Sequence, residues 1–286
     1  MRYTRNEFLK LMGFTGATAL TAVTGFAKKP DVVRRNPDSF VENTTLSLGL
    51  ASYTLRKFKL DDVIKMTLRV GLGSIALKDV HMPLDSSADD IKAIAGKVRS
   101  AGLNLYGAGV IYMKTQQEVE TAFAYAKNAG LETIIAAPSH ELLPLINEQV
   151  KKYNIKLAIH NHGPGDSLYT SPTDVYEKVK NLDKRVGLCM DIGHVVRIGQ
   201  DPVPMIEKYK DRLFDMHMKD HEKAAPEGLA TEIGRGIIDI PNILKALKKI
   251  AYQGKVAIEY EKNEDDPMPG LAESVGYLRG VLKVIG

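Results

Sequence analysis

The sequence predicts an α/β fold in which eight strand–helix units close into a (β/α)8 barrel. From about residue 45 onward, short apolar runs alternate with amphipathic helical patterns. Eight such pairs occupy roughly 240 residues, which is the usual size of this barrel. The structural alternative is an open, doubly wound sheet. It is disfavoured because no glycine-rich dinucleotide-binding motif follows the first apolar run.

The strands are predicted from apolar runs that are too short for helices and rich in β-branched or aliphatic residues. In chain order these runs occupy residues 46–51, 74–80, 103–111, 132–137, 155–160, 186–191, 212–217 and 255–260.

The helices are predicted from apolar residues repeated every three or four positions. In one of them, Thr115 and Glu118 have the spacing of a capping box, and the apolar stripe that follows consists of Val119, Ala122, Phe123 and Ala126. Another begins near Pro241, a residue suited to a first helical turn. Three glycines just after helices are expected to adopt left-handed caps: Gly102, Gly130 and Gly254.

The first 27 residues have the pattern of a secretory signal peptide. A basic start is followed by an uncharged stretch over 11–26, with Gly25 and Ala27 at the positions that signal peptidase requires to be small. The stretch is too short for a membrane-spanning helix. We therefore expect an exported, periplasmic protein with a signal peptide at 1–27, a linker at 28–44 and a barrel at 45–286.

The export route is left open by the sequence. Residues 4–13, "TRNEFLKLMG", resemble a twin-arginine signal, but Asn6 stands where the second arginine belongs. A Sec-type signal and a plain amphipathic helix are the alternatives.

Composition excludes several classes of protein. The net charge of +4 is not gathered into a basic cluster, so a nucleic-acid partner is not expected. The single cysteine, Cys189, rules out an internal disulfide framework.

Four successive predicted strands end in residues that can bind a metal. They are His160, Asp191, His217 and Glu259. The C-terminal ends of barrel strands form the active-site face, so these side chains should meet there. A mixed nitrogen and oxygen set suits one Mn²⁺, Zn²⁺, Co²⁺ or Fe²⁺ ion better than Mg²⁺. Each residue alone could be an ordinary surface residue, and the prediction depends on finding all four at the ends of neighbouring strands.

Strand periodicity supports this assignment, with one exception. The residues two positions before the four candidates should also face the barrel interior. Three of them are small or apolar, namely Ala158, Cys189 and Ala257, whereas Asp215 is a carboxylic acid for which the sequence offers no explanation.

Further residues near the predicted strand ends are candidates for proton transfer and substrate binding. We expect Glu259, His162 and Lys219 to be catalytic. Asp220 and Glu261 are expected in loops that contact solvent or neighbouring side chains.

Three other residues, His194, Arg235 and His81, are candidates for substrate contact at the barrel mouth. A plain turn at Gly234 and Gly236 is the alternative explanation of the stretch around Arg235, and a solvated loop is the alternative for His81.

Five motifs occur in a fixed order: "IHNHGPGD", "CMDIGH", "MHMKD", "GRGIID" and "IEYE". Over roughly residues 45–286 the chain thereby resembles the xylose isomerase-like TIM-barrel superfamily, which includes sugar phosphate isomerases and epimerases, ketose epimerases and inosose dehydratase. The resemblance implies a single-metal site at His160, Asp191, His217 and Glu259, with His194 near the substrate. It also implies a small carbohydrate as substrate.

One departure from the family pattern bears on the reaction. The ketose epimerases carry a glutamate where this chain has His160, so only Glu259 remains of their acid–base pair. We therefore expect metal-assisted proton abstraction next to a carbonyl, and the sequence does not choose among isomerisation, epimerisation and elimination.

An exported 3-keto-glycoside lyase or hydratase is one alternative function, and a non-catalytic sugar- or metal-binding barrel is another. An apurinic endonuclease is disfavoured, because it needs three metals and a cationic surface.

Overall fold

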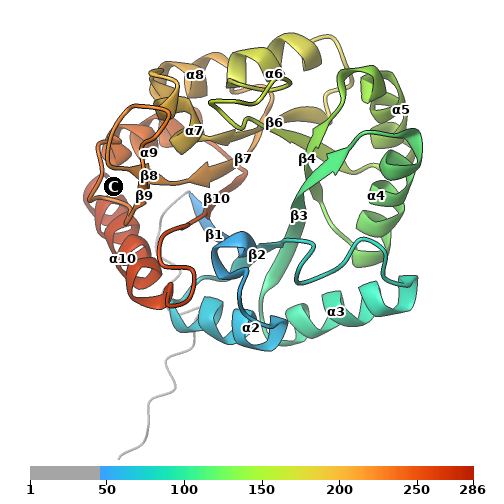
Figure 1. Ribbon diagram of the computed structural model, residues 1–286, viewed down its shortest axis with the longest axis horizontal. Helices are drawn as coiled ribbons and strands as arrows, with labels where there is room; N and C mark the ends of the chain where they lie inside the picture. Colours follow the sequence, from blue (N-terminus) through green and yellow to red (C-terminus); the bar gives the residue numbers. More distant parts are fainter. Residues whose placement is uncertain (1–45) are drawn as a thin grey trace, which may run out of the picture. The chain divides into compact units, whose positions relative to one another are not determined.

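The computed structural model describes residues 46–286, which form a closed, eight-stranded parallel barrel. Figure 1 shows the helices as an outer ring around the strands. The expected signal peptide and linker lie outside the described residues.

The barrel strands follow one another around the ring in the order β1-β10-β7-β6-β5-β4-β3-β2. Each lies within, or within two residues of, a predicted apolar run, which confirms the predicted strands. The bounds are β1 Ser47–Ala51, β2 Ser74–Leu77, β3 Asn104–Met113, β4 Thr133–Pro138, β5 Lys156–His160, β6 Val186–Asp191, β7 Leu213–Met218 and β10 Lys255–Ile258.

Helices follow the strands and cover the outside of the barrel. Their bounds are η2 Ser52–Leu55, α2 Leu60–Arg69, α3 Ala88–Ser100, α4 Gln116–Ala129, η3 His140–Leu142, α5 Leu143–Tyr153, α6 Pro172–Val179, α7 Ile192–Arg197, α8 Pro202–Lys208, α9 Ile240–Lys249 and α10 Met268–Val284. No helix within 46–286 is long and apolar enough to cross a membrane. A short antiparallel pair, β8 Asp220–His221 and β9 Ala230–Thr231, was not predicted.

Three of the four cap signals in the sequence, namely the capping box and two of the three glycines, correspond to observed caps. The Thr115 hydroxyl accepts the Glu118 N–H, and the Glu118 carboxylate accepts the Thr115 N–H, as a capping box requires. Gly102 and Gly130 have the expected positive φ angles of 91° and 63°. The expectation for Gly254 is wrong, because Ala251 takes the left-handed conformation after α9.

Gly254 is required for packing instead. A Cβ atom at this position would lie 2.2 Å from the carbonyl oxygen of Phe214. Only a residue without a side chain permits that approach between neighbouring segments.

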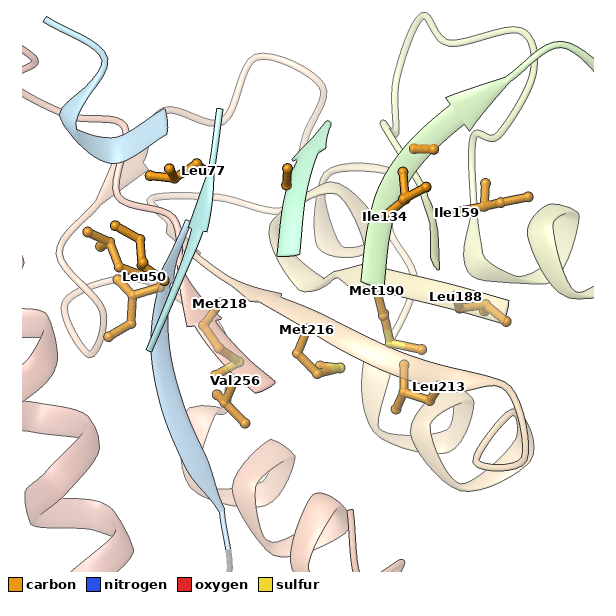
Figure 2. Close-up of a cluster of buried hydrophobic side chains, with 14 of the residues drawn as sticks. Leu50, Leu77, Ile134, Ile159, Leu188, Met190, Leu213, Met216, Met218 and Val256 are labelled. Atoms are coloured by element: carbon orange, nitrogen blue, oxygen red, sulfur yellow. The ribbon is translucent and has the colours of Figure 1, made fainter. Parts of the chain in front are cut away.

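Alternate residues of each strand serve two different cores. Figure 2 shows the larger one, in which outward-facing side chains such as Leu188, Met190 and Met216 pack together. The inward-facing residues form a smaller cluster that includes Tyr106, Ala158 and Cys189. The period of two that separates these sets also directs the last inward residue of each strand to the barrel mouth.

Candidate metal centre

The four predicted metal-binding side chains meet in one buried cluster. His160 ends β5, Asp191 ends β6, His217 lies in β7, and Glu259 follows β10 directly. One ligand-type atom from each lies within 4.8 Å of the others. None of the four is more than 7% exposed. We call these residues the four-residue cluster.

Close contacts within the cluster join atoms that are suited to a shared cation. His217 Nδ1 lies 3.1 Å from His160 Nε2 and 3.1 Å from Glu259 Oε2. His160 Nε2 is 3.3 Å from Asp191 Oδ2. The nitrogen and oxygen atoms therefore converge on one small volume, as the ligands of a single ion must.

The protonation states of His160, Asp191 and Glu259 also suit metal binding. Burial lowers the pKa of His160 to about 3, so its imidazole is neutral near pH 7. Burial opposes ionisation of Asp191 and Glu259, but the surrounding basic side chains together outweigh it and hold the pKa of each carboxyl well below its usual value. His194 and Lys219 contribute most at Asp191, and Lys219 and His217 contribute most at Glu259. Neutral imidazoles and ionised carboxylates are the forms that bind metals.

Lys219 completes the electrostatics of the cluster. Its Nζ lies 3.0 Å from Asp191 Oδ2 and 2.8 Å from Glu259 Oε2, and it also pairs with Glu261. Three carboxylates thus face one ammonium, and with a neutral His217 this leaves a surplus of two negative charges. One divalent cation would supply the missing positive charge.

His217 can carry a proton that competes with such a cation. Burial opposes its protonation, but Cys189 and Glu259 together raise the pKa of His217 well above its ordinary value. A proton on His217 and a divalent ion are therefore alternative partners for the same carboxylate.

Two further histidines surround the cluster on the mouth side. The ring of His162 lies 4.6 Å from that of His160, and the ring of His194 lies 5.8 Å from it. Burial lowers the pKa of His162, and it lowers the pKa of His194 to about 4. Both rings are therefore near the cluster and can exchange hydrogen bonds with a ligand in their neutral forms.

Tyr112 belongs to the same mouth and was not predicted. Its hydroxyl lies 2.9 Å from His162 Nε2, and the residue is 54% exposed. The available signal was its place near the end of β3, on the rim where active-site residues gather. Sequence reasoning missed it because an aromatic residue in a strand usually belongs to a core.

The structure does not join His81 or Arg235 to the four-residue cluster. His81 is buried, with Nδ1 2.8 Å from Ser52 Oγ and Nε2 3.2 Å from the carbonyl oxygen of Leu55. Both ring nitrogens are thus occupied, and the solvated-loop alternative is wrong for this residue. Arg235 is exposed and pairs with Glu273 of α10 at 2.7 Å.

Asp220 explains the glycine-rich stretch near Arg235. Its buried carboxylate accepts backbone N–H groups from Gly234 at 2.9 Å, Gly236 at 3.0 Å and Ile238 at 3.1 Å. A Cβ atom at Gly236 would lie 2.1 Å from Asp220 Oδ1. Asp220 lies in the short strand β8 and not in a loop, and of the two expected kinds of contact it makes those with neighbouring groups and not with solvent. Its carboxylate thus shapes the turn from within. Glu261 is partly exposed beside Lys219, as expected.

Asp215, the exception among the inward positions, lies inside the barrel and is 0% exposed. The Tyr106 hydroxyl donates to Oδ1 at 3.3 Å, and Cys189 Sγ lies 3.8 Å from Oδ2. Burial raises the pKa of this carboxyl to about 7.

Comparison with known sequences identifies partial relatives. The sequence profile of the xylose isomerase-like TIM barrel matches residues 69–281. The rhizopine catabolism protein MocC of Rhizobium meliloti is 27% identical over 145 residues, or 46% of this chain and 44% of that protein. An inosose dehydratase of Clostridium perfringens is 29% identical over 200 residues, or 61% of this chain and 63% of the dehydratase. The aligned regions span less than two thirds of either relative.

Comparison with solved structures supports the same fold. The IolI protein with a bound zinc atom superposes with a TM-score of 0.69 at 18% identity, covering 84% of this chain and 99% of its own. L-ribulose 3-epimerase superposes with a TM-score of 0.68 at 15% identity, covering 84% and 95%. Because the profile matches most of the barrel and these structures share its architecture, the chain belongs to the xylose isomerase-like TIM-barrel family.

Proposed function

We propose that the protein is a metal-dependent enzyme that abstracts a proton next to a carbonyl group of a carbohydrate. The observation that carries this proposal is the convergence of His160, Asp191, His217 and Glu259 beside Lys219. The names of two relatives, inosose dehydratase and L-ribulose 3-epimerase, support a carbohydrate substrate.

The four-residue cluster would hold one divalent ion. Its mixed donor set suits Zn²⁺, Mn²⁺, Co²⁺ or Fe²⁺, and the structurally similar IolI protein contains zinc. When bound, such an ion polarises a carbonyl oxygen and makes the neighbouring C–H bond more acidic.

Glu259 is the proposed proton acceptor. Its carboxyl is ionised because Lys219, with Nζ 2.8 Å from Oε2, lowers its pKa against the effect of burial. The same contact fixes the direction of the carboxylate. Lys219 can also donate a hydrogen bond to an oxygen on which negative charge develops.

The candidates for a second proton-transfer group are the mouth histidines His162 and His194, and Lys219. Burial lowers the pKa of His160 to about 3, so it does not replace the second carboxylate of a two-glutamate epimerase. His162 is better placed, since it is partly exposed and its Nε2 meets the Tyr112 hydroxyl at 2.9 Å. This pair could protonate a departing oxygen, which favours elimination from a 3-keto-glycoside as the second candidate reaction.

Export is part of the proposal. The basic start, the uncharged stretch over 11–26 and the small residues Gly25 and Ala27 support a periplasmic location. A free sugar or glycoside would then be a more accessible substrate than a phosphorylated intermediate.

The test is incubation with keto-sugars and 3-keto-glycosides in heavy water, followed by NMR. Deuterium incorporation next to the carbonyl without loss of a substituent would indicate isomerisation or epimerisation, whereas release of water or an aglycone would indicate elimination. Binding without exchange or product formation across the set would favour the non-catalytic barrel and refute the proposed enzyme.

A further inference from the structure

Asp215 is a buried acid that the proposed reaction does not use. It lies in β7 two residues before His217, so both side chains point into the barrel. The corresponding residues of three neighbouring strands are Ala158, Cys189 and Ala257, which carry no charge at this depth. Burying a carboxyl among such residues is costly unless it has partners.

The partners of Asp215 form a polar layer beneath the four-residue cluster. Tyr106 donates its hydroxyl hydrogen to the carboxyl group from β3, and Cys189 lies beside it on β6. The only basic side chain within ion-pair distance of Asp215 in residues 46–286 is His217, whose Nε2 is 3.9 Å from Oδ2. The carboxyl therefore faces the underside of a predicted metal ligand.

The two ring nitrogens of His217 have different surroundings. Nδ1 faces the cluster, 3.1 Å from both His160 and Glu259. Nε2 faces the barrel interior and is buried without a hydrogen-bond partner. A neutral imidazole that offers the lone pair of Nδ1 to a metal must carry its hydrogen on Nε2.

We infer that Asp215 is a positioning residue that accepts the Nε2–H of His217 and thereby directs Nδ1 toward the metal. This inference rests on the proposed metal site. A shift of about 1 Å brings the 3.9 Å pair to hydrogen-bond distance. The Tyr106 hydrogen bond holds the carboxyl in the orientation that faces the ring. Acceptors of this kind fix both the tautomer and the orientation of metal-binding histidines.

The first test compares two buried carboxyl-to-amide substitutions. Asp215→Asn replaces the carboxyl group beneath His217 by an amide, whereas Glu232→Gln makes the same change at a buried carboxylate that pairs with Tyr260 and Lys262. We expect Asp215→Asn to weaken zinc binding by about 10- to 100-fold in competition with a chromophoric chelator. Glu232→Gln should bind zinc as the parent does. Parent-like affinity in Asp215→Asn, or an equal loss in the control, would overturn the inference.

The second test does not use Asp215→Asn, so it remains decisive if that variant fails to fold. In protein labelled with ¹⁵N-histidine and loaded with zinc, the His217 signals are those absent from a His217→Gln sample. We expect a protonated Nε2 and a zinc-bound Nδ1. A protonated Nδ1, or a parent that binds no zinc, would contradict the positioning role.

Failure of this inference can be told apart from failure of the proposed reaction. Weakened zinc binding in Asp215→Asn, in a parent that exchanges no deuterium, would support the positioning role and refute the reaction. Deuterium exchange in the parent, together with parent-like zinc affinity in Asp215→Asn, would support the reaction and refute the positioning role.

Discussion

Replacing Glu259 by glutamine separates proton abstraction from metal binding. The substitution preserves the size of the side chain and one oxygen ligand, but an amide cannot accept a proton as a carboxylate does. Lys219 would keep two anionic partners, Asp191 and Glu261, so the buried ammonium would not be left unpaired. We therefore expect the variant to fold.

The expected loss of turnover is about 10²- to 10⁴-fold, which is typical of a removed general base. It corresponds to about 2.7–5.4 kcal/mol in the activation free energy, at 1.36 kcal/mol for each factor of ten. The assay is deuterium incorporation into a confirmed substrate, with metal in excess to offset weaker binding by the amide.

Glu261→Gln is the matched control, because Glu261 also pairs with Lys219 but its side chain is 33% exposed. It should retain turnover within a few-fold of the parent, because Glu261 is partly exposed and Lys219 keeps its contacts with Asp191 and Glu259. Parent-like turnover of Glu259→Gln at saturating metal would show that Glu259 is not the base, and the role would pass to His162, His194 or Lys219.

Three further predictions concern the metal and the N-terminus. Asp191→Ala should lose stoichiometric metal while the barrel stays folded, and equal metal content by elemental analysis would remove Asp191 from the ligand set. Zinc affinity should fall as pH decreases, because Cys189 and Glu259 raise the pKa of His217 against the effect of burial, and the proton on His217 then competes with the ion. Zinc titrations at several pH values test this, and an affinity that does not change with pH would contradict it. N-terminal sequencing from the native host should find a chain starting near Lys28, and an intact Met1 on cytoplasmic protein would refute export.

The sequence by itself determined the barrel and the four-residue cluster. Strand periodicity is local, so the apolar runs identify each strand and, to within three residues, the position at which it ends. Parallel strands of a barrel all end at the same rim. His160, Asp191, His217 and Glu259 could therefore be assigned to one site without knowledge of any long-range contact. The same periodicity marked Asp215 as an inward-facing acid.

Only the tertiary structure decided what the loop residues and the interior acid contact. Ser52 and Leu55 hold His81, Glu273 pairs with Arg235, and the Tyr112 hydroxyl meets His162 fifty residues along the chain. These partners lie 26 to 50 residues apart, and their side chains meet because the folded barrel brings together segments whose local sequences carry no record of the contact. Asp215 likewise gains a possible role only when Tyr106, Cys189 and His217 from three strands surround it. A period of two gives the direction in which a side chain points, but the packing of other segments determines what it meets.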